Sequence, residues 1–228
     1  MNYQIDAPGS AIRTTVKLPA SKSISNRALI LNALSYSAYD VENLSDCDDT
    51  NLMVKALNSN DRDFNVGAAG TTMRFLTAFL SKVVGEWTIT GTERMKNRPI
   101  KVLVDALNAL GARIEYMEKE GYPPLRIFGS ALQGGEISLP GNVSSQYISA
   151  ILMIAPLTEN GVTLHLEGAI ISRPYIHITL QLMEQYGVRA SWTENTIKVL
   201  PQEYKPIRFT VESDWSAASY WYEIMGLS

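Results

Sequence analysis

Apolar residues recur at helical spacing in two segments that run almost in parallel. One starts at Asn97 and reads NRPIKVLVDALNALGARIEY, and the other starts at Ser172 and reads SRPYIHITLQLMEQYGVRAS. Each opens on an Arg-Pro pair, which suits the first turn of a helix, and each periodic stretch ends at a glycine, Gly111 or Gly187, as a C-terminal cap does. Both then continue as strand patterns. The chain therefore contains an internal repeat of a helix followed by strands.

A further series of apolar helices precedes these segments: SKSISNRALILNALS, AGTTMRFLTAFLSKV and SSQYISAILMIAPL. Each is followed by a second helix, so that one unit reads strand, helix, strand, helix and two strands. Three such units fit in the chain. The first is short, because only SNDRDFNV separates its second helix from Gly67. The predicted fold class is α/β, built from three βαβαββ units of which the first is shortened.

Small polar and cationic residues gather at the starts of the three helices in this further series. The unpaired N–H groups of a helix start favour an anion. If the units pack around a pseudo-threefold axis, the three starts face the same end of the domain and could bind one anionic, hydroxyl-rich ligand. Each start alone also has a plainer explanation, as a helix cap, a glycine turn or a solvated charge. The residues are Lys22, Ser23 and Arg27 in the first unit, Gly67, Gly70, Thr71 and Arg74 in the second, and Ser144, Ser145 and Gln146 in the third.

The stretch TERMKNRP is a second basic feature. Arg94, Lys96 and Arg98 alternate, so in an extended segment they would share one side. A guanidinium suits a phosphate or carboxylate, although a basic surface loop is the plainer explanation. Ser172 and Tyr175 stand at the matching place in the third unit.

Composition narrows the function classes. The chain has 228 residues and a net charge of −3, which disfavours a duplex nucleic acid as partner. The single cysteine, Cys47, excludes an intramolecular disulfide and fits a reducing compartment. No signal-peptide pattern occurs, and no apolar run approaches the roughly 18 residues of a membrane span. We therefore expect a cytoplasmic protein without a membrane partner.

Several chemical motifs are missing. The sequence has no HExxH, CxxC or other metal-ligand spacing, so no metal site is expected. Asp46, Asp48 and Asp49 are interpreted as a capping cluster for the next helix. Their charges are expected to raise the pKa of Cys47 and to make it a poor nucleophile. No carboxylate stands out as a general base.

The last segment resembles the opening of a fourth unit. A strand runs to about Val211, Asp214 or Ser216 can cap, and an aromatic helix follows. Such a helix has nothing of its own to bury against, so we expect the natural protein to continue beyond it. A C-terminal helix docked on the domain is the alternative.

The motifs together resemble the 5-enolpyruvylshikimate-3-phosphate synthase family. The resemblance implies two lobes, each with three units around a pseudo-threefold axis, and an active site in the cleft between them. It also implies transfer of the enolpyruvyl group from phosphoenolpyruvate to shikimate 3-phosphate, by addition and elimination and without a cofactor. The motifs that carry it, in chain order, are LPASKSISNRALIL, GAAGTTMRFL, RMKNRPI, VSSQYISAILMIAPL, SRPYIHITLQLMEQYGV and VESDWSAASYW.

The resemblance also implies roles for residues of this chain. Lys22 would be the catalytic residue and would lie between the two substrates. The contacts to shikimate 3-phosphate would be Lys22, Ser23, Arg27, Ser144, Ser145, Gln146, Ser172 and Tyr175. The contacts to phosphoenolpyruvate would be Lys22, Gly70, Arg98 and Gln146. Two positions depart from the family pattern: Ala68 replaces an asparagine, and Phe75 replaces a proline.

The resemblance divides the chain into three parts. Residues 18–212 would form one enolpyruvyl transferase lobe, residues 1–17 would be a crossing segment of a second lobe, and residues 213–228 would begin that lobe. The acidic residues for proton transfer would lie in the second lobe, so the isolated chain is expected to be inactive. One alternative is the related transferase acting on UDP-N-acetylglucosamine, which Ser23 and the absence of a cysteine in TERMKNRP disfavour. Another is a non-catalytic anion-binding module.

Overall fold

The protein is described by a computed structural model over residues 13–227. Most of the expected crossing segment 1–17 therefore lies outside the described residues. The helices are α1 (Lys22–Leu34), α2 (Asp48–Leu57), α3 (Gly70–Lys82), α4 (Glu93–Lys96), α5 (Lys101–Ala109), α6 (Ser145–Ile154), α7 (Arg173–Gln185) and α8 (Trp215–Leu227). The strands are β1 (Val41–Glu42), β2 (Asp63–Asn65), β3 (Gly85–Thr90), β4 (Arg113–Tyr116), β5 (Leu125–Gly129), β6 (Gly135–Pro140), β7 (Val162–Glu167), β8 (Ala190–Thr193), β9 (Thr196–Val199) and β10 (Phe209–Thr210).

Two four-stranded sheets share one topology, in the orders β2-β3-β5-β4 and β6-β7-β9-β8. In each sheet the first two strands are parallel and the other neighbours are antiparallel. A parallel pair needs a crossover, which α3 supplies in one sheet and α6 in the other. The predicted α/β class is confirmed, and both units have the predicted order of helices and strands.

The first unit is shorter. Its strand β1 pairs in parallel with β10, with Val41 opposite Phe209. Between Leu57 and Asp63 the chain forms a turn and no hairpin, so this unit has only the two-stranded sheet.

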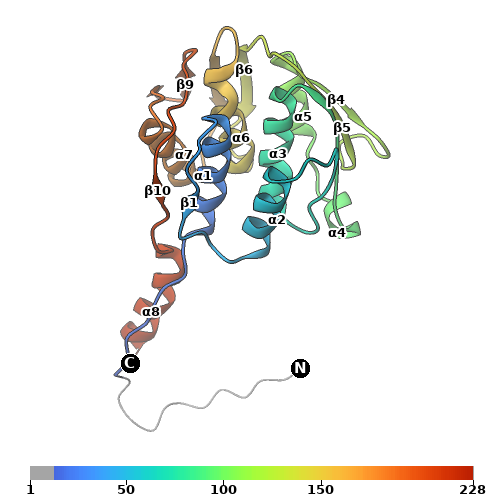
Figure 1. The fold of residues 1–228 in the computed structure, drawn as a ribbon. Coiled ribbons are helices and arrows are strands. Elements are labelled where there is room, and N and C mark those ends of the chain that lie inside the picture. The colour runs from blue at the N-terminus through green and yellow to red at the C-terminus, as the bar shows by residue number, and fades with distance from the viewer. Residues whose placement is uncertain (1–12, 228) are drawn as a thin grey trace.

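Six helices pack between and beside the sheets (Figure 1). The central helices α1, α3 and α6 contact one another, and each outer helix contacts two of them: α2 lies against α1 and α3, α5 against α3 and α6, and α7 against α6 and α1. Nearly every residue of α3 and α6 is buried, as expected of helices that are surrounded on all sides. This adjacency is compatible with a pseudo-threefold axis, which stays a prediction.

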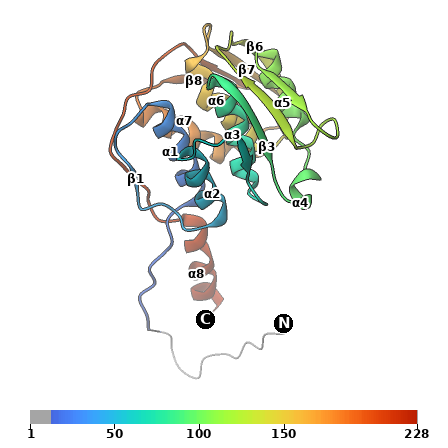
Figure 2. The ribbon, with the colours of Figure 1, turned by 45° about the vertical axis from the view of Figure 1, so that its right-hand side comes forward.

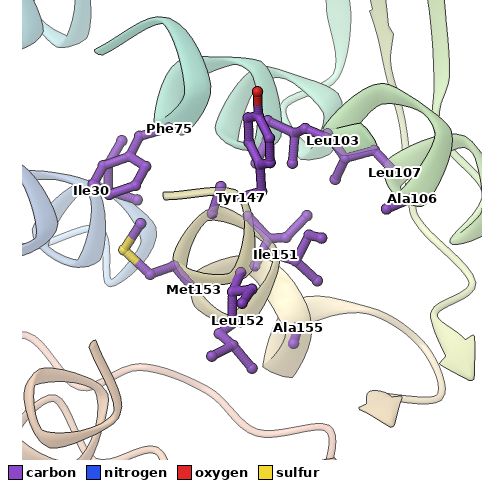
Figure 3. Close-up of a cluster of buried hydrophobic side chains, with 14 of the residues drawn as sticks. Ile30, Phe75, Leu103, Ala106, Leu107, Tyr147, Ile151, Leu152, Met153 and Ala155 are labelled. Atoms are coloured by element: carbon purple, nitrogen blue, oxygen red, sulfur yellow. The ribbon is translucent and has the colours of Figure 1, made fainter. Parts of the chain in front are cut away.

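The main core lies where the central helices meet. Ile30 of α1, Phe75 of α3 and Met153 of α6 are at most 1% exposed and point toward one another (Figure 3). The sheets cover this core through buried strand residues such as Ile89 and Leu164. Apolar contact thus fixes the relative positions of the three helix starts.

Two local predictions need correction. Residues Glu93–Lys96 form the short helix α4, so Arg94 and Lys96 do not share the side of an extended segment with Arg98. Lys96 instead pairs with Glu93 and Glu118 at the surface. The helix after Arg98 was predicted to begin at Pro99. It begins at Lys101, because Ile100 has a non-helical backbone.

Helix α8 extends away from the rest of the molecule in both views (Figures 1 and 2). Asp214 caps it by accepting hydrogen bonds from the N–H groups of Ser216 and Ala217. Its side chains Trp215, Tyr220 and Tyr222 are largely exposed.

Two buried tyrosines provide a test of the core. The Tyr204 hydroxyl donates to the Met153 carbonyl at 2.8 Å, whereas the Tyr186 hydroxyl is buried without a partner among the described residues. Tyr204→Phe should lower the free energy of unfolding by about 1 kcal/mol or more, because a hydrogen bond is lost. Tyr186→Phe should leave it unchanged or raise it by up to about 1 kcal/mol. Urea unfolding measures both, and an equal loss in the two variants would contradict the assigned hydroxyl environments.

Candidate functional site

The starts of the central helices are linked by a chain of polar contacts. Nζ of Lys22, at the start of α1, lies 3.8 Å from a carboxylate oxygen of Asp49 on α2. The other carboxylate oxygen accepts a hydrogen bond from the Thr71 N–H of α3 at 2.9 Å. The Thr71 hydroxyl accepts one from Nε2 of Gln146 on α6 at 3.1 Å. Lys22, Thr71 and Gln146 therefore face one region, although their helices are far apart in sequence.

The start of α1 presents a cation to solvent. Ser21 caps the helix by accepting a hydrogen bond from the Ile24 N–H. Ser25 is buried and binds back to the Ser21 carbonyl, which fixes the first turn. The Lys22 side chain is 45% exposed, and Ser23 beside it is half-buried. An anion could reach both residues.

Arg27 has a different environment from the one that its sequence position suggested. Its side chain is almost fully buried and donates to the hydroxyls of Thr179 and Ser149 and to the carbonyls of Ser23 and Tyr175. Burial lowers the pKa of Arg27 to about 10, with the Tyr175 side chain opposing, so it stays charged at neutral pH. A guanidinium has five N–H donors, so one on Nη1 remains for a ligand beyond these four bonds. Arg27 thus joins α1 to α6 and α7 beneath the helix starts.

Two arginines converge on the start of α3. A Cβ atom on Gly70 would lie 2.5 and 2.7 Å from the terminal nitrogens of Arg98 and 2.8 Å from Nη1 of Arg74. Burial and the neighbouring Arg74 charge lower the pKa of Arg98, while Asp49 opposes them. The guanidinium groups occupy the space of a side chain at this position, so a larger residue would displace them. The Gly70 backbone therefore lies directly against two cations.

Arg74 is one of the residues expected at the second anion-binding helix start. The family resemblance assigns no substrate to it. Its Nη1 donates to the Gly70 carbonyl at 2.7 Å, and its guanidinium lies over the Tyr147 ring. Nε of Arg74 is buried without a partner among the residues described. Its position four residues after Gly70, on the same helix face, was the available signal.

The third helix start supplies hydroxyls and an amide. Ser144 caps α6 by accepting a hydrogen bond from the Gln146 N–H, and Ser145 is buried beside it. Ser172 precedes α7, and its carbonyl accepts from the N–H of Tyr175, whose side chain is exposed. Because the Tyr175 carbonyl also contacts Arg27, the start of α7 lies next to the buried arginine.

The two departures from the family pattern lie in different environments. Ala68 is exposed and lines a groove of about 480 Å³ together with Asp48 and Asp49. Phe75 is buried, and the Arg27 guanidinium lies 5.3 Å from its ring centroid. Phe75 therefore supports Arg27 from α3 by a cation–π contact.

Cys47 differs from the expectation. Burial raises its pKa, but hydrogen bonds from the Thr50 and Ser45 side chains and from the Thr50 backbone lower it, and the net shift is downward. The expected effect of the neighbouring carboxylates is present through Asp49 but smaller than these bonds.

Residues 13–227 contain neither a metal-binding cluster nor a membrane-spanning helix. No group of three or more His, Cys, Asp or Glu residues could hold a metal ion there. Within the same range no helix has the length and apolar character needed to cross a bilayer.

Comparison with known proteins gives consistent matches. The family model for EPSP synthase (3-phosphoshikimate 1-carboxyvinyltransferase) matches residues 7–60 and 58–224. A 3-phosphoshikimate 1-carboxyvinyltransferase of Bacteroides fragilis is 61% identical over 229 residues, which cover 100% of this chain and 56% of the relative. The 3-phosphoshikimate 1-carboxyvinyltransferase of Vibrio campbellii is 43% identical over 242 residues, which cover 93% of this chain and 57% of the relative. The chain thus spans about half the length of the curated relatives it matches.

A solved structure has the same fold. The EPSP synthase from Acinetobacter baumannii superposes with a TM-score of 0.79 at 21% sequence identity. The match covers 90% of this chain and 51% of the other.

Substitution of Gly70 tests the convergence of the two arginines. Gly70→Ala should weaken binding of inorganic phosphate roughly tenfold, because the new methyl group displaces the guanidinium groups from the helix start. Gly226→Ala is the control, since a Cβ there meets nothing within 4 Å. Calorimetric titration of both variants measures the effect, and unchanged phosphate affinity in Gly70→Ala would refute the prediction.

Proposed function

The chain belongs to the EPSP synthase family, and we propose that it supplies one half of an active site for enolpyruvyl transfer. In this reaction the 5-hydroxyl of shikimate 3-phosphate adds to C2 of phosphoenolpyruvate while C3 gains a proton. Loss of a C3 proton and of phosphate then yields 5-enolpyruvylshikimate 3-phosphate and inorganic phosphate. The observation that carries the proposal is the contact chain that joins the starts of α1, α3 and α6.

Phosphoenolpyruvate is assigned to the cationic side of these helix starts. Arg98 offers a guanidinium beside the Gly70 backbone, and Lys22 offers a half-exposed ammonium. Gln146 adds an amide from α6. Fixed cations at helix starts stabilise a phosphate without having to reorganise when it binds.

Shikimate 3-phosphate is assigned to the hydroxyl-rich side. Ser144, Ser145 and Ser172 offer hydroxyls at the starts of α6 and α7, and Tyr175 adds an exposed phenol. Ser23 and the remaining Nη1 donor of Arg27 extend this side toward α1. In this arrangement Lys22 lies between the two substrates, which accounts for the catalytic role assigned to it.

The proposal includes a second lobe that closes the site. Residues 18–212 are assigned to one lobe, and residues 1–17 and 213–228 are assigned to the second lobe. The exposed aromatic side chains of α8 support a contact of this kind. Proton transfer is assigned to acidic residues of that second lobe. A cytoplasmic location is also proposed and rests on the single cysteine.

Ligand binding by the 228-residue chain tests the assigned site. Calorimetric titration should detect shikimate 3-phosphate binding, and Lys22→Met should weaken it roughly tenfold or more, because one charged contact is lost. Lys101→Met is the matched control, since that lysine begins the outer helix α5 and pairs there with Glu120 from a later loop. No heat with millimolar ligand would refute binding by this chain, and preferential binding of UDP-N-acetylglucosamine would favour the related transferase.

The absence of turnover is a separate prediction. With both substrates present, the 228-residue chain should release no phosphate above the uncatalysed rate, because the proton-transferring carboxylates are assigned to the other lobe. A coupled phosphate-release assay makes the measurement. Release that is lost in Lys22→Met would show that this chain holds a complete active site.

A further inference from the structure

Asp49 contacts residues at two of the helix starts of the proposed site, although it was not assigned to either substrate. Its carboxylate lies 3.8 Å from Nζ of Lys22 and accepts the Thr71 N–H at 2.9 Å. Its backbone carbonyl accepts the Thr72 hydroxyl at 2.6 Å. One residue of α2 therefore binds the first turn of α3 twice and also faces the cation of α1.

The contact with Thr71 satisfies a group that α3 cannot satisfy itself. The first N–H groups of a helix have no partner within it. The residue at the N-cap position of α3 is Ala69, whose side chain has no acceptor. Thr71 is buried, so without Asp49 its N–H would lack both a partner and ready access to water. Asp49 thus caps α3 from a different helix.

The same contact reaches α6. The Thr71 hydroxyl accepts from Nε2 of Gln146, so a shift of Thr71 moves the amide assigned to the substrates. The Asp49 charge also favours the charged form of Arg98, against the effect of Arg74. Lys22, Gln146 and Arg98 are therefore all coupled to one carboxylate.

We propose that Asp49 is a positioning residue, which holds the Lys22 ammonium and the start of α3 in the geometry that binds the anionic substrates. The inference rests on the proposed function for the identity of those substrates. Asp49 acts by positioning its neighbours and does not itself contact a reacting atom.

The sign of a substitution effect distinguishes positioning from bulk electrostatics. A carboxylate near a cationic site repels an anion, so removing its charge alone should strengthen anion binding. A carboxylate that positions the cations should do the opposite. Asp48 is the matched control, because it is an exposed carboxylate in the same first turn of α2.

Amide hydrogen exchange tests the cross-helix cap without any ligand. In Asp49→Ala the Thr71 amide should exchange about tenfold faster or more, because the N–H loses its acceptor. Asp49→Asn should retain most of the protection, since its side-chain oxygen can still accept. Asp48→Asn should match the parent chain. The Leu76 amide, in the middle of α3, reports whether the helix itself is intact. Unchanged Thr71 exchange in Asp49→Ala would overturn the proposal.

Calorimetric titration with phosphoenolpyruvate and with shikimate 3-phosphate tests whether Asp49 affects substrate binding. Asp49→Ala should bind both roughly tenfold more weakly, and Asp49→Asn should be intermediate, despite the loss of a repelling charge. Asp48→Asn should bind equally well or up to about twofold more tightly. Tighter binding by both Asp49 variants would overturn the proposal. If the parent chain binds neither substrate, the proposed function fails for this chain, while the exchange experiment still decides the role of Asp49.

Discussion

Mutual burial of α1, α3 and α6 is the constraint on which the rest of the structure depends. Helices that are covered on nearly every side can present polar groups to a ligand only at their ends, and any polar group in their middle needs a partner inside the protein. The middles of α3 and α6 are mostly apolar, and buried Thr77 and Ser149 there are hydrogen-bonded. Serines, threonines and a glycine gather at the starts. Because helix starts also carry unpaired N–H groups, the packing that forms the core also produces the surface to which we assign the anionic substrates.

Arg27 shows what this packing demands of a charge. A buried guanidinium is tolerated only when its N–H groups have acceptors. Ser149 and Thr179 provide them from α6 and α7, and Phe75 provides a ring face from α3. The arginine therefore joins elements of all three units. Its contribution to a ligand site depends on the one N–H that these contacts leave.

The sequence was sufficient to predict the repeated units, the shortened first unit and the three polar helix starts, because local periodicity and capping encode them. It was insufficient where a residue acts across helices. Arg27 looks like a surface cation at the start of an amphipathic helix, and Asp49 looks like a local cap of its own α2. Their actual partners, Thr179 and Thr71, lie 152 and 22 residues away along the chain. Only the packing of the helices brings these pairs together.

The starts of α1 and α3 hold more cations than carboxylates. Arg98 has a lowered pKa because it is partly buried and lies close to Arg74, while Lys22 and Asp49 are nearby. One carboxylate cannot compensate three cations, so these side chains repel one another. In the proposed function a bound phosphate relieves that repulsion and gains contacts that are already in place. The repulsion that disfavours the cations at these helix starts therefore favours the proposed anionic ligand.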